Sequence, residues 1–218
     1  RLIDTPRGTV LIDGRDICDY PVQHLRKIVT LVPQDPFLFS ASLRENLTYD
    51  EPTRGEALLM DAADAAGLTS AIADFTDGLD TILGERGQTL SGGQKQRATL
   101  ARGLVRNSPI LLLDDCFSAV DTETEELILS VLARMRGDKT TILISHRVST
   151  ARHADRIFII DNGHITESGT HDELIAHEGY YADLAAVQSN QDEDRARKSN
   201  LLHKLDDEEE LALAGADS

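Results

Sequence analysis

The run LSGGQ, from Leu90 to Gln94, is the first group of residues whose types and spacing could act on a phosphate. Its two glycines, Gly92 and Gly93, would let a backbone approach a ligand closely. Ser91 is a good N-cap for a helix predicted from Gly92 to Arg106. The start of a helix offers unpaired N–H groups and the positive end of the dipole, which together suit a γ-phosphate. A helix cap alone explains the Ser-Gly-Gly run equally well.

A second chemical signal is Asp114, the last residue of a predicted strand from Pro109. The apolar run before it is typical of a parallel strand that is buried on both faces. A carboxylate at the C-terminal edge of such a strand lies where α/β sheets bind ligands. It can hold magnesium beside nucleotide phosphates. Strands that end in Asp are common, so a structural carboxylate is the alternative.

The elements that must position these residues alternate between strands and helices, which predicts an α/β fold. The segment from about 42 to 107 is rich in Ala and Leu at helical spacing, and we interpret it as a helical insert. A second buried strand is expected at Thr140–Ser145. The remaining predicted strands are Thr9–Asp13, Ile28–Val32, Arg156–Ile160 and His164–Glu167, and the remaining helices are Thr122–Met135, Thr170–His177 and Tyr180–Gln188.

Composition limits the function classes. The 218 residues include 22 Lys and Arg against 38 Asp and Glu, a formal charge of -16, which argues against a protein that coats nucleic acid. No apolar run approaches the length of a membrane span. The two cysteines, Cys18 and Cys116, form no zinc pattern, and Cys116 is expected to fill a small site after its strand. After Ser189 follow nine acidic and four basic residues, typical of a disordered tail.

The order of the motifs separates the alternatives. The chain carries LVPQDPFLFS around Gln34, then GERGQTLSGGQKQR from Gly84 to Arg97, then ILLLDDCFSAVD, then SHR at Ser145–Arg147. In this order the chain resembles the nucleotide-binding domain of ATP-binding cassette (ABC) transporters. The runs LFSASLRENL and GHITESGTHDELIAHEGYYADL are similar to the exporter branch. The resemblance covers residues 1–188, which would be one ABC ATPase domain, with residues 189–218 as the acidic tail.

The resemblance implies a P-loop NTPase-like parallel sheet and a role for each motif. Gln34 would be the Q-loop glutamine, which touches magnesium and the attacking water and signals to the membrane domain. Asp114 would be the Walker B carboxylate that holds magnesium. Asp121 would be the D-loop residue at a dimer interface, and His146 would be the switch histidine that contacts the γ-phosphate of ATP.

The same resemblance implies partners. Ser91, Gly92, Gly93 and Gln94 would act on ATP that a second nucleotide-binding domain holds. A transmembrane domain, fused upstream, would place the chain at the cytoplasmic face of the cell membrane. No nucleic-acid partner is expected, and the arginines of QKQRATLARGLVR are expected to support the helix and its contacts.

Two departures from the family pattern stand out. The P-loop, GxxxxGK[ST], is absent from the sequence, although it would precede Gly8. We therefore expect a sheet that is incomplete at its N-terminus, weak ATP binding by the chain alone, and truncation of a longer polypeptide.

The second departure is Asp115, where the family usually has a Glu that acts as general base. Aspartate is shorter by about 1.5 Å, and a base must reach its proton within hydrogen-bond distance. Exporters with Asp here are often heterodimers with one impaired site. We therefore expect an impaired own site and an intact LSGGQ that completes the partner's site. Retention of His146 argues against impairment.

Three functions remain in view: an ATPase subunit of an exporter, a mainly regulatory nucleotide-binding half, and a soluble ABC ATPase. Asp115 favours the second at this chain's own site, whereas Gln34, Asp121, His146 and LSGGQ favour the first for the pair. The third would normally show tandem cassettes, long insertions or basic patches, and none is visible in the sequence.

Overall fold

The computed structural model describes residues 3–84 and 90–191, which divide into two compact units between His153 and Ala154. Two sequence-based expectations fall outside the described residues: the stretch at residues 85–89, which directly precedes the LSGGQ run, and the acidic tail from residue 192 onward. Residues 189–191 belong to a helix that begins at residue 180.

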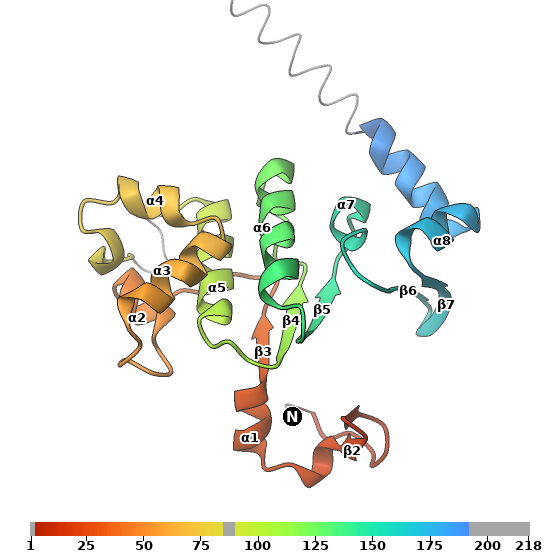
Figure 1. The fold of residues 1–218 in the computed structure, drawn as a ribbon, viewed down its shortest axis with the longest axis horizontal. Coiled ribbons are helices and arrows are strands. Elements are labelled where there is room, and N and C mark those ends of the chain that lie inside the picture. The colour runs from red at the N-terminus through yellow and green to blue at the C-terminus, as the bar shows by residue number, and fades with distance from the viewer. Residues whose placement is uncertain (1–2, 85–89, 192–218) are drawn as a thin grey trace, which may run out of the picture. The chain divides into compact units, whose positions relative to one another are not determined.

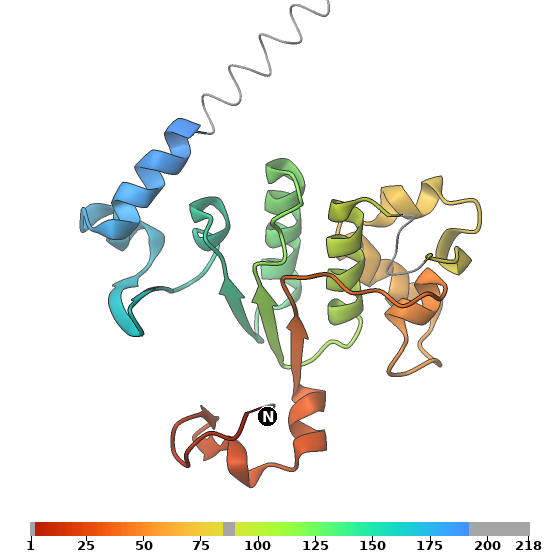
Figure 2. The same ribbon diagram turned by 180° about the vertical axis from the view of Figure 1, so that it is seen from behind.

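The first unit is built on a parallel sheet of three strands in the order β3 (Val29–Val32), β4 (Ile110–Asp114) and β5 (Thr140–Ile144). The strands lie side by side in both views of the ribbon (Figure 1; Figure 2). Their register pairs Leu31 with Leu112 and Leu112 with Ile142. The predicted α/β fold with a P-loop NTPase-like parallel sheet is confirmed.

Burial of this sheet follows the alternation of side chains along each strand. Val32, Leu111 and Leu113 are buried in the main core, together with residues of α5 (Gly92–Leu104) and α6 (Thr122–Met135). Helix α5 packs closely on β3. A Cβ atom added at Gly103 would lie only 2.6 Å from Cγ2 of Val32, which is too close for an ordinary contact. The glycine therefore fixes the approach of α5 to the sheet.

The prediction that β5 is a buried strand is wrong for the described residues: Ile142 and Ile144 are each at least half exposed, and β5 has no fully buried residue. In β4, Leu111 and Leu113 are buried on one face, whereas Ile110 and Leu112 on the other face are only half-buried. Successive side chains point to opposite faces, so an apolar run supplies two apolar faces whether or not both are covered. Apolarity by itself therefore does not establish a covering layer.

The segment between β3 and β4 is helical, as predicted. It contains α2 (Leu43–Leu47), α3 (Glu56–Ala65), α4 (Thr69–Asp74), the short 3₁₀ helix η2 (Gly78–Asp80) and α5. Side chains of this segment, mostly leucine and alanine, form the larger part of the core. Helix α5 contributes to this core and also packs on the sheet, so it positions the LSGGQ run at its own N-terminus.

The N-terminal segment is a hairpin of β1 (Leu11–Ile12) and β2 (Arg15–Asp16), followed by η1 (Ile17–Asp19) and α1 (Val22–Ile28). Asp13 and Gly14 both have positive φ, which a tight hairpin turn requires. The predicted strand at Thr9–Asp13 is therefore one arm of a hairpin. The strand predicted from Ile28 begins at Val29, because Ile28 ends α1, a helix that our sequence interpretation missed.

Helix α6 has the predicted bounds, and α7 (Val148–Ala151) follows β5. In the second unit, β6 (Ile157–Asp161) and β7 (His164–Gly169) form an antiparallel hairpin, followed by α8 (His171–Ala176). The buried Tyr181 lies with its hydroxyl 2.9 Å from Nδ1 of His171. Within the described residues, no helix is long and apolar enough to cross a membrane.

Candidate nucleotide site

Three of the predicted site residues meet at the carboxyl ends of the parallel strands. Asp115 comes directly after β4. Gln34 and His146 each lie two positions after the last residue of β3 and β5, respectively. Nε2 of Gln34 donates to Oδ2 of Asp115 over 3.2 Å, and Nδ1 of His146 lies 3.1 Å from Oδ1 of the same carboxylate. Parallel strands end at a common edge, so residues 34, 115 and 146 become neighbours there.

Asp115 is held in an unusual backbone conformation. Its φ is +43°, in the left-handed region that non-glycine residues rarely adopt. Its N–H donates to the carbonyl of Ile144 over 2.9 Å, which continues the β4–β5 pairing by one residue. The side chain is 14% exposed, whereas the His146 side chain is 69% exposed. The chain thus turns sharply at Asp115 and presents its carboxylate at the sheet edge.

The donor set at this edge is compatible with magnesium. Asp114 is the half-buried last residue of β4, and Gln34 adds an amide oxygen. Among residues 3–84 and 90–191, no group of three or more His, Cys, Asp or Glu side chains could hold a metal by itself. Magnesium is usually bound by one or two carboxylates together with substrate phosphates and waters, so a sparse oxygen set fits it.

The signature residues Ser91 and Gln94 cap α5 reciprocally. Oγ of Ser91 accepts from the N–H of Gln94 over 3.2 Å, and Oε1 of Gln94 accepts from the N–H of Ser91 over 2.9 Å. This capping box satisfies two of the N–H groups that a helix start leaves open. The predicted N-cap at Ser91 is confirmed, although the helix ends at Leu104, two residues before the predicted end.

The signature helix is bound to the segment that follows β4. A Cβ atom at Gly93 would lie 2.8 Å from the carbonyl oxygen of Ala119, so only glycine fits there. The buried Gln96 accepts from the N–H of Ala119 and donates to Oγ of Ser118, both over 2.8 Å. Sequence reasoning missed Gln96; the signal was an amide on the same helix face as the buried Thr99 and Leu100, three and four residues further on.

Asp121 is the N-cap of α6. Its carboxylate accepts from the N–H of Thr124 over 2.8 Å, and this hydrogen bond is the main cause that lowers the pKa of the Asp121 carboxyl. The Asp121 carboxylate therefore stays ionised at neutral pH, and it lies at the N-terminus of α6. Its exposed position leaves the carboxylate accessible at the surface.

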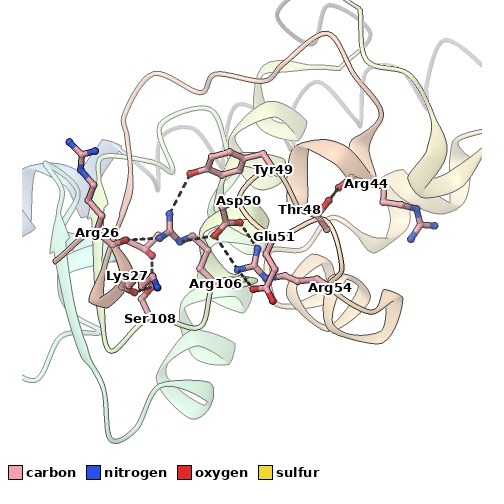
Figure 3. A network of polar contacts seen from close by, with 11 residues as sticks. Arg26, Lys27, Arg44, Thr48, Tyr49, Asp50, Glu51, Arg54, Arg106 and Ser108 are labelled. Carbon is pink, nitrogen blue, oxygen red and sulfur yellow. Dashed lines mark hydrogen bonds and ion pairs between the residues drawn. The ribbon is translucent and has the colours of Figure 1, made fainter. Parts of the chain in front are cut away.

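Two arginines of the QKQRATLARGLVR run support the helix, as predicted. Arg97 donates to the carbonyl of Gly67 over 2.7 Å. Arg106 donates to the carbonyl of Arg26 over 2.6 Å and lies 3.5 Å from Asp50, which also pairs with Arg54 (Figure 3). This network joins the end of α5 to α1 and to the segment after α2.

The third arginine of that run, Arg102, lines an aromatic groove of about 170 Å³. Its guanidinium lies 5.6 Å from the centre of the Tyr49 ring, and burial lowers the pKa of the side chain. Phe37 and Phe39, which follow Gln34 closely in sequence, contact each other edge to face and are about half exposed. The groove also includes Leu31, Thr99, Gly103 and Arg106.

Comparison with known proteins identifies the family. The model of the ABC transporter family matches residues 1–118, more than half of the chain. This chain belongs to the ABC transporter family. The resemblance to ABC exporters, inferred from the motif order, is confirmed.

The relatives are exporters in name. Proteins of Staphylococcus aureus and Bacillus subtilis, both named "Putative multidrug export ATP-binding/permease protein", are each 44% identical over 189 residues, or 87% of this chain. The structure of a bacterial Atm1-family ABC exporter with ATP bound matches 82% of the chain with a TM-score of 0.77 and 42% identity. The chain spans about a third of the length of these relatives: 33% of the two named proteins and 31% of the solved chain.

Proposed function

We propose that this chain is an ATP-binding and hydrolysing part of an ABC-type exporter, in which ATP-driven dimerisation of two such domains is coupled to transport across a membrane. The contact of Gln34, Asp115 and His146 at one sheet edge is the observation that carries the proposal. An amide, a carboxylate and an imidazole at the carboxyl ends of parallel strands can together bind and orient the terminal phosphate and the attacking water.

In this proposal each residue has a defined task. Asp114 and the amide oxygen of Gln34 would hold magnesium, which would neutralise charge on the phosphates. The exposed His146 contacts the γ-phosphate. Asp115 occupies the position of the general base, and the Gln34 amide and the His146 imidazole orient its two carboxylate oxygens.

We propose further that the chain's own site is impaired and that its LSGGQ run completes the site of a partner domain. The Asp115 carboxylate is one methylene shorter than the glutamate usual in this family, and its backbone is fixed by the bond to Ile144. The capped Ser91 and the close packing of Gly93 preserve an intact signature. A heterodimer with a competent second domain fits this division best.

The aromatic groove is the proposed contact with the membrane domain. Phe37, Phe39 and Tyr49 expose ring surface beside Arg102, an arrangement that suits an amphipathic helical segment with an acidic residue. Because Phe37 lies three residues after Gln34, a segment that docks there would transmit movement to the site. Phe39→Glu should uncouple transport from ATP turnover, whereas Leu127→Glu, at an exposed leucine of α6, should leave the coupling unchanged.

The direct test is ATP turnover in an exporter assembly that contains this chain. His146→Ala and Gln34→Ala should each lower turnover at this chain's site, measured in the Asp115→Glu background. The 218-residue chain alone should bind ATP weakly, because its sequence has no P-loop. If neither substitution changes the ATP turnover of the assembly, the result contradicts the proposal.

A mainly regulatory role is the second candidate, and Asp115 is the observation that favours it. A regulatory half would bind ATP and support dimerisation with the same affinity whether residue 115 is Asp or Glu. If Asp115→Glu leaves turnover unchanged but Ser91→Arg removes it, the chain acts only through its signature.

A further inference from the structure

One carboxylate buried in the first unit has no task in the site described above. Glu125, in the first turns of α6, is 1% exposed. Its Oε1 accepts a hydrogen bond from the hydroxyl of Thr150, and its Oε2 forms an ion pair with the guanidinium of Arg147. A buried carboxylate is costly unless it is paired, so these two contacts fix where the segment 147–150 can lie.

Both partners of Glu125 belong to the segment that presents the switch histidine. Arg147 directly follows His146, and Thr150 lies within α7, one turn further on. Arg147 also donates to the hydroxyl of Thr122 over 3.0 Å, and its N–H donates to Oγ of Ser145. One arginine therefore joins the turn around His146 to the start of α6, where Asp121 is the cap.

The His146 side chain is 69% exposed and lies 3.1 Å from Asp115, so the turn that carries it decides whether the imidazole reaches that carboxylate. We propose that Glu125 is a positioning residue: through Arg147 and Thr150 it holds the turn that places His146 against Asp115. The proposal rests on the function proposed for His146. It also links the switch histidine to the D-loop, because Thr122, bonded to Arg147, immediately follows Asp121.

The neighbouring residue supplies a matched control. Glu126 pairs with Arg152, so it joins the same helix α6 to the end of α7, and both partners are about half exposed. An exposed pair of this kind contributes little to structure. Glu125→Gln and Glu126→Gln make the same chemical change one residue apart.

The experiment measures ATP turnover in the assembled exporter, in the Asp115→Glu background, so that this chain's own site contributes. Glu125→Gln keeps the volume and an acceptor for Thr150, and it removes the charge that holds Arg147. We expect kcat to fall by about 10- to 100-fold, the effect of misplacing a group by about 1 Å, while the KM for ATP changes less than about twofold. Glu126→Gln should leave both values unchanged.

A double-mutant cycle separates positioning from general stabilisation. If Glu125 acts through His146, Glu125→Gln should lower kcat little further once His146→Ala is present. An equal fall with and without His146, or no fall at all, would overturn the inference while leaving the proposed function intact. If His146→Ala itself has no effect on kcat, the proposed function fails, and the inference fails with it.

Discussion

The Nδ1 atom of His146 lies 3.1 Å from Oδ1 of Asp115, although 31 positions in the sequence separate the two residues. The second oxygen of the same carboxylate is bonded to Gln34. A short side chain at position 115 therefore occupies the place where three strand ends meet. The effects expected from substitutions at the site depend on this contact.

The first prediction concerns the length of the residue at position 115. Asp115→Glu adds one methylene and should bring a carboxylate within reach of the attacking water. General-base catalysis contributes about 10²- to 10⁴-fold, so turnover at this site should rise by one or more orders of magnitude. Steady-state ATP hydrolysis of the assembled exporter is the measurement, with Asp115→Asn as the control. Turnover equal to that of the unmodified chain would contradict an impaired site.

The second prediction concerns the signature. Ser91→Arg places a bulky cation where the start of α5 would meet the partner's ATP, and it should abolish hydrolysis at the partner's site. Loss of the cap should also destabilise the chain by about 1 kcal/mol, so Ser91→Ala is the control that removes the cap without the bulk. Single-turnover hydrolysis separates the two effects. If both variants lose hydrolysis equally, the cap alone explains the loss.

Gly92 and Gly93 should differ sharply in their tolerance of alanine. A Cβ atom at Gly93 would lie 2.8 Å from the carbonyl oxygen of Ala119, whereas one at Gly92 would lie 3.6 Å from the nearest atom, Cβ of Ala119. We expect Gly93→Ala to lower the free energy of unfolding by about 1–3 kcal/mol and Gly92→Ala to be neutral or stabilising. Urea denaturation of both variants tests this; similar stabilities would show that the Ala119 carbonyl moves aside.

Glu125 predicts a pH dependence of stability. Burial is the largest cause that raises the pKa of its carboxyl above the unfolded value of about 4.3, against the opposing effects of Thr150 and Arg147. The folded state then binds this proton more tightly than the unfolded state. The resulting stabilisation is present below the unfolded pKa and is lost as the pH rises through the raised folded pKa.

Glu125→Gln does not titrate and isolates this contribution. The free energy of unfolding of the unmodified chain, minus that of the variant, should decrease as the pH rises above about 4.3, the unfolded pKa. Urea denaturation at intervals across this range measures the difference, and other carboxyl groups cancel because both chains carry them. A difference that grows with pH would mean that the pair with Arg147 outweighs burial.

The two cysteines should differ in reactivity. Cys116 is 2% exposed in the main core, and burial raises the pKa of its thiol to about 12, so almost no thiolate forms at pH 8. Cys18 is half-buried. Alkylation with iodoacetamide followed by peptide mass spectrometry should modify Cys18 first and Cys116 only on unfolding. Early modification of Cys116 would contradict its expected role as a small core residue.

Much of this molecule could be read from local patterns. Helix α6 has its predicted bounds, and Ser91 caps α5 as predicted, because both follow from local sequence signals; the cap at Asp121 was not predicted. The short helix α1 was missed because its last residue, Ile28, continues into the apolar run of the next strand and was assigned to that strand. The exposure of β5 and the partial burial of one face of β4 were missed because an apolar run does not reveal what packs on it.

The sequence by itself determined the motif order, the family resemblance and the identity of Gln34, Asp115 and His146 as candidates, because these depend on residue type and spacing alone. Only the tertiary structure decided that both oxygens of Asp115 are engaged, that Gly93 lies against Ala119, and that Glu125 is buried against Arg147 and Thr150. These contacts join residues that are 22 to 81 positions apart in the sequence. They exist because parallel strands bring their ends to one edge and because helices α5 and α6 pack beside them, which no local pattern specifies.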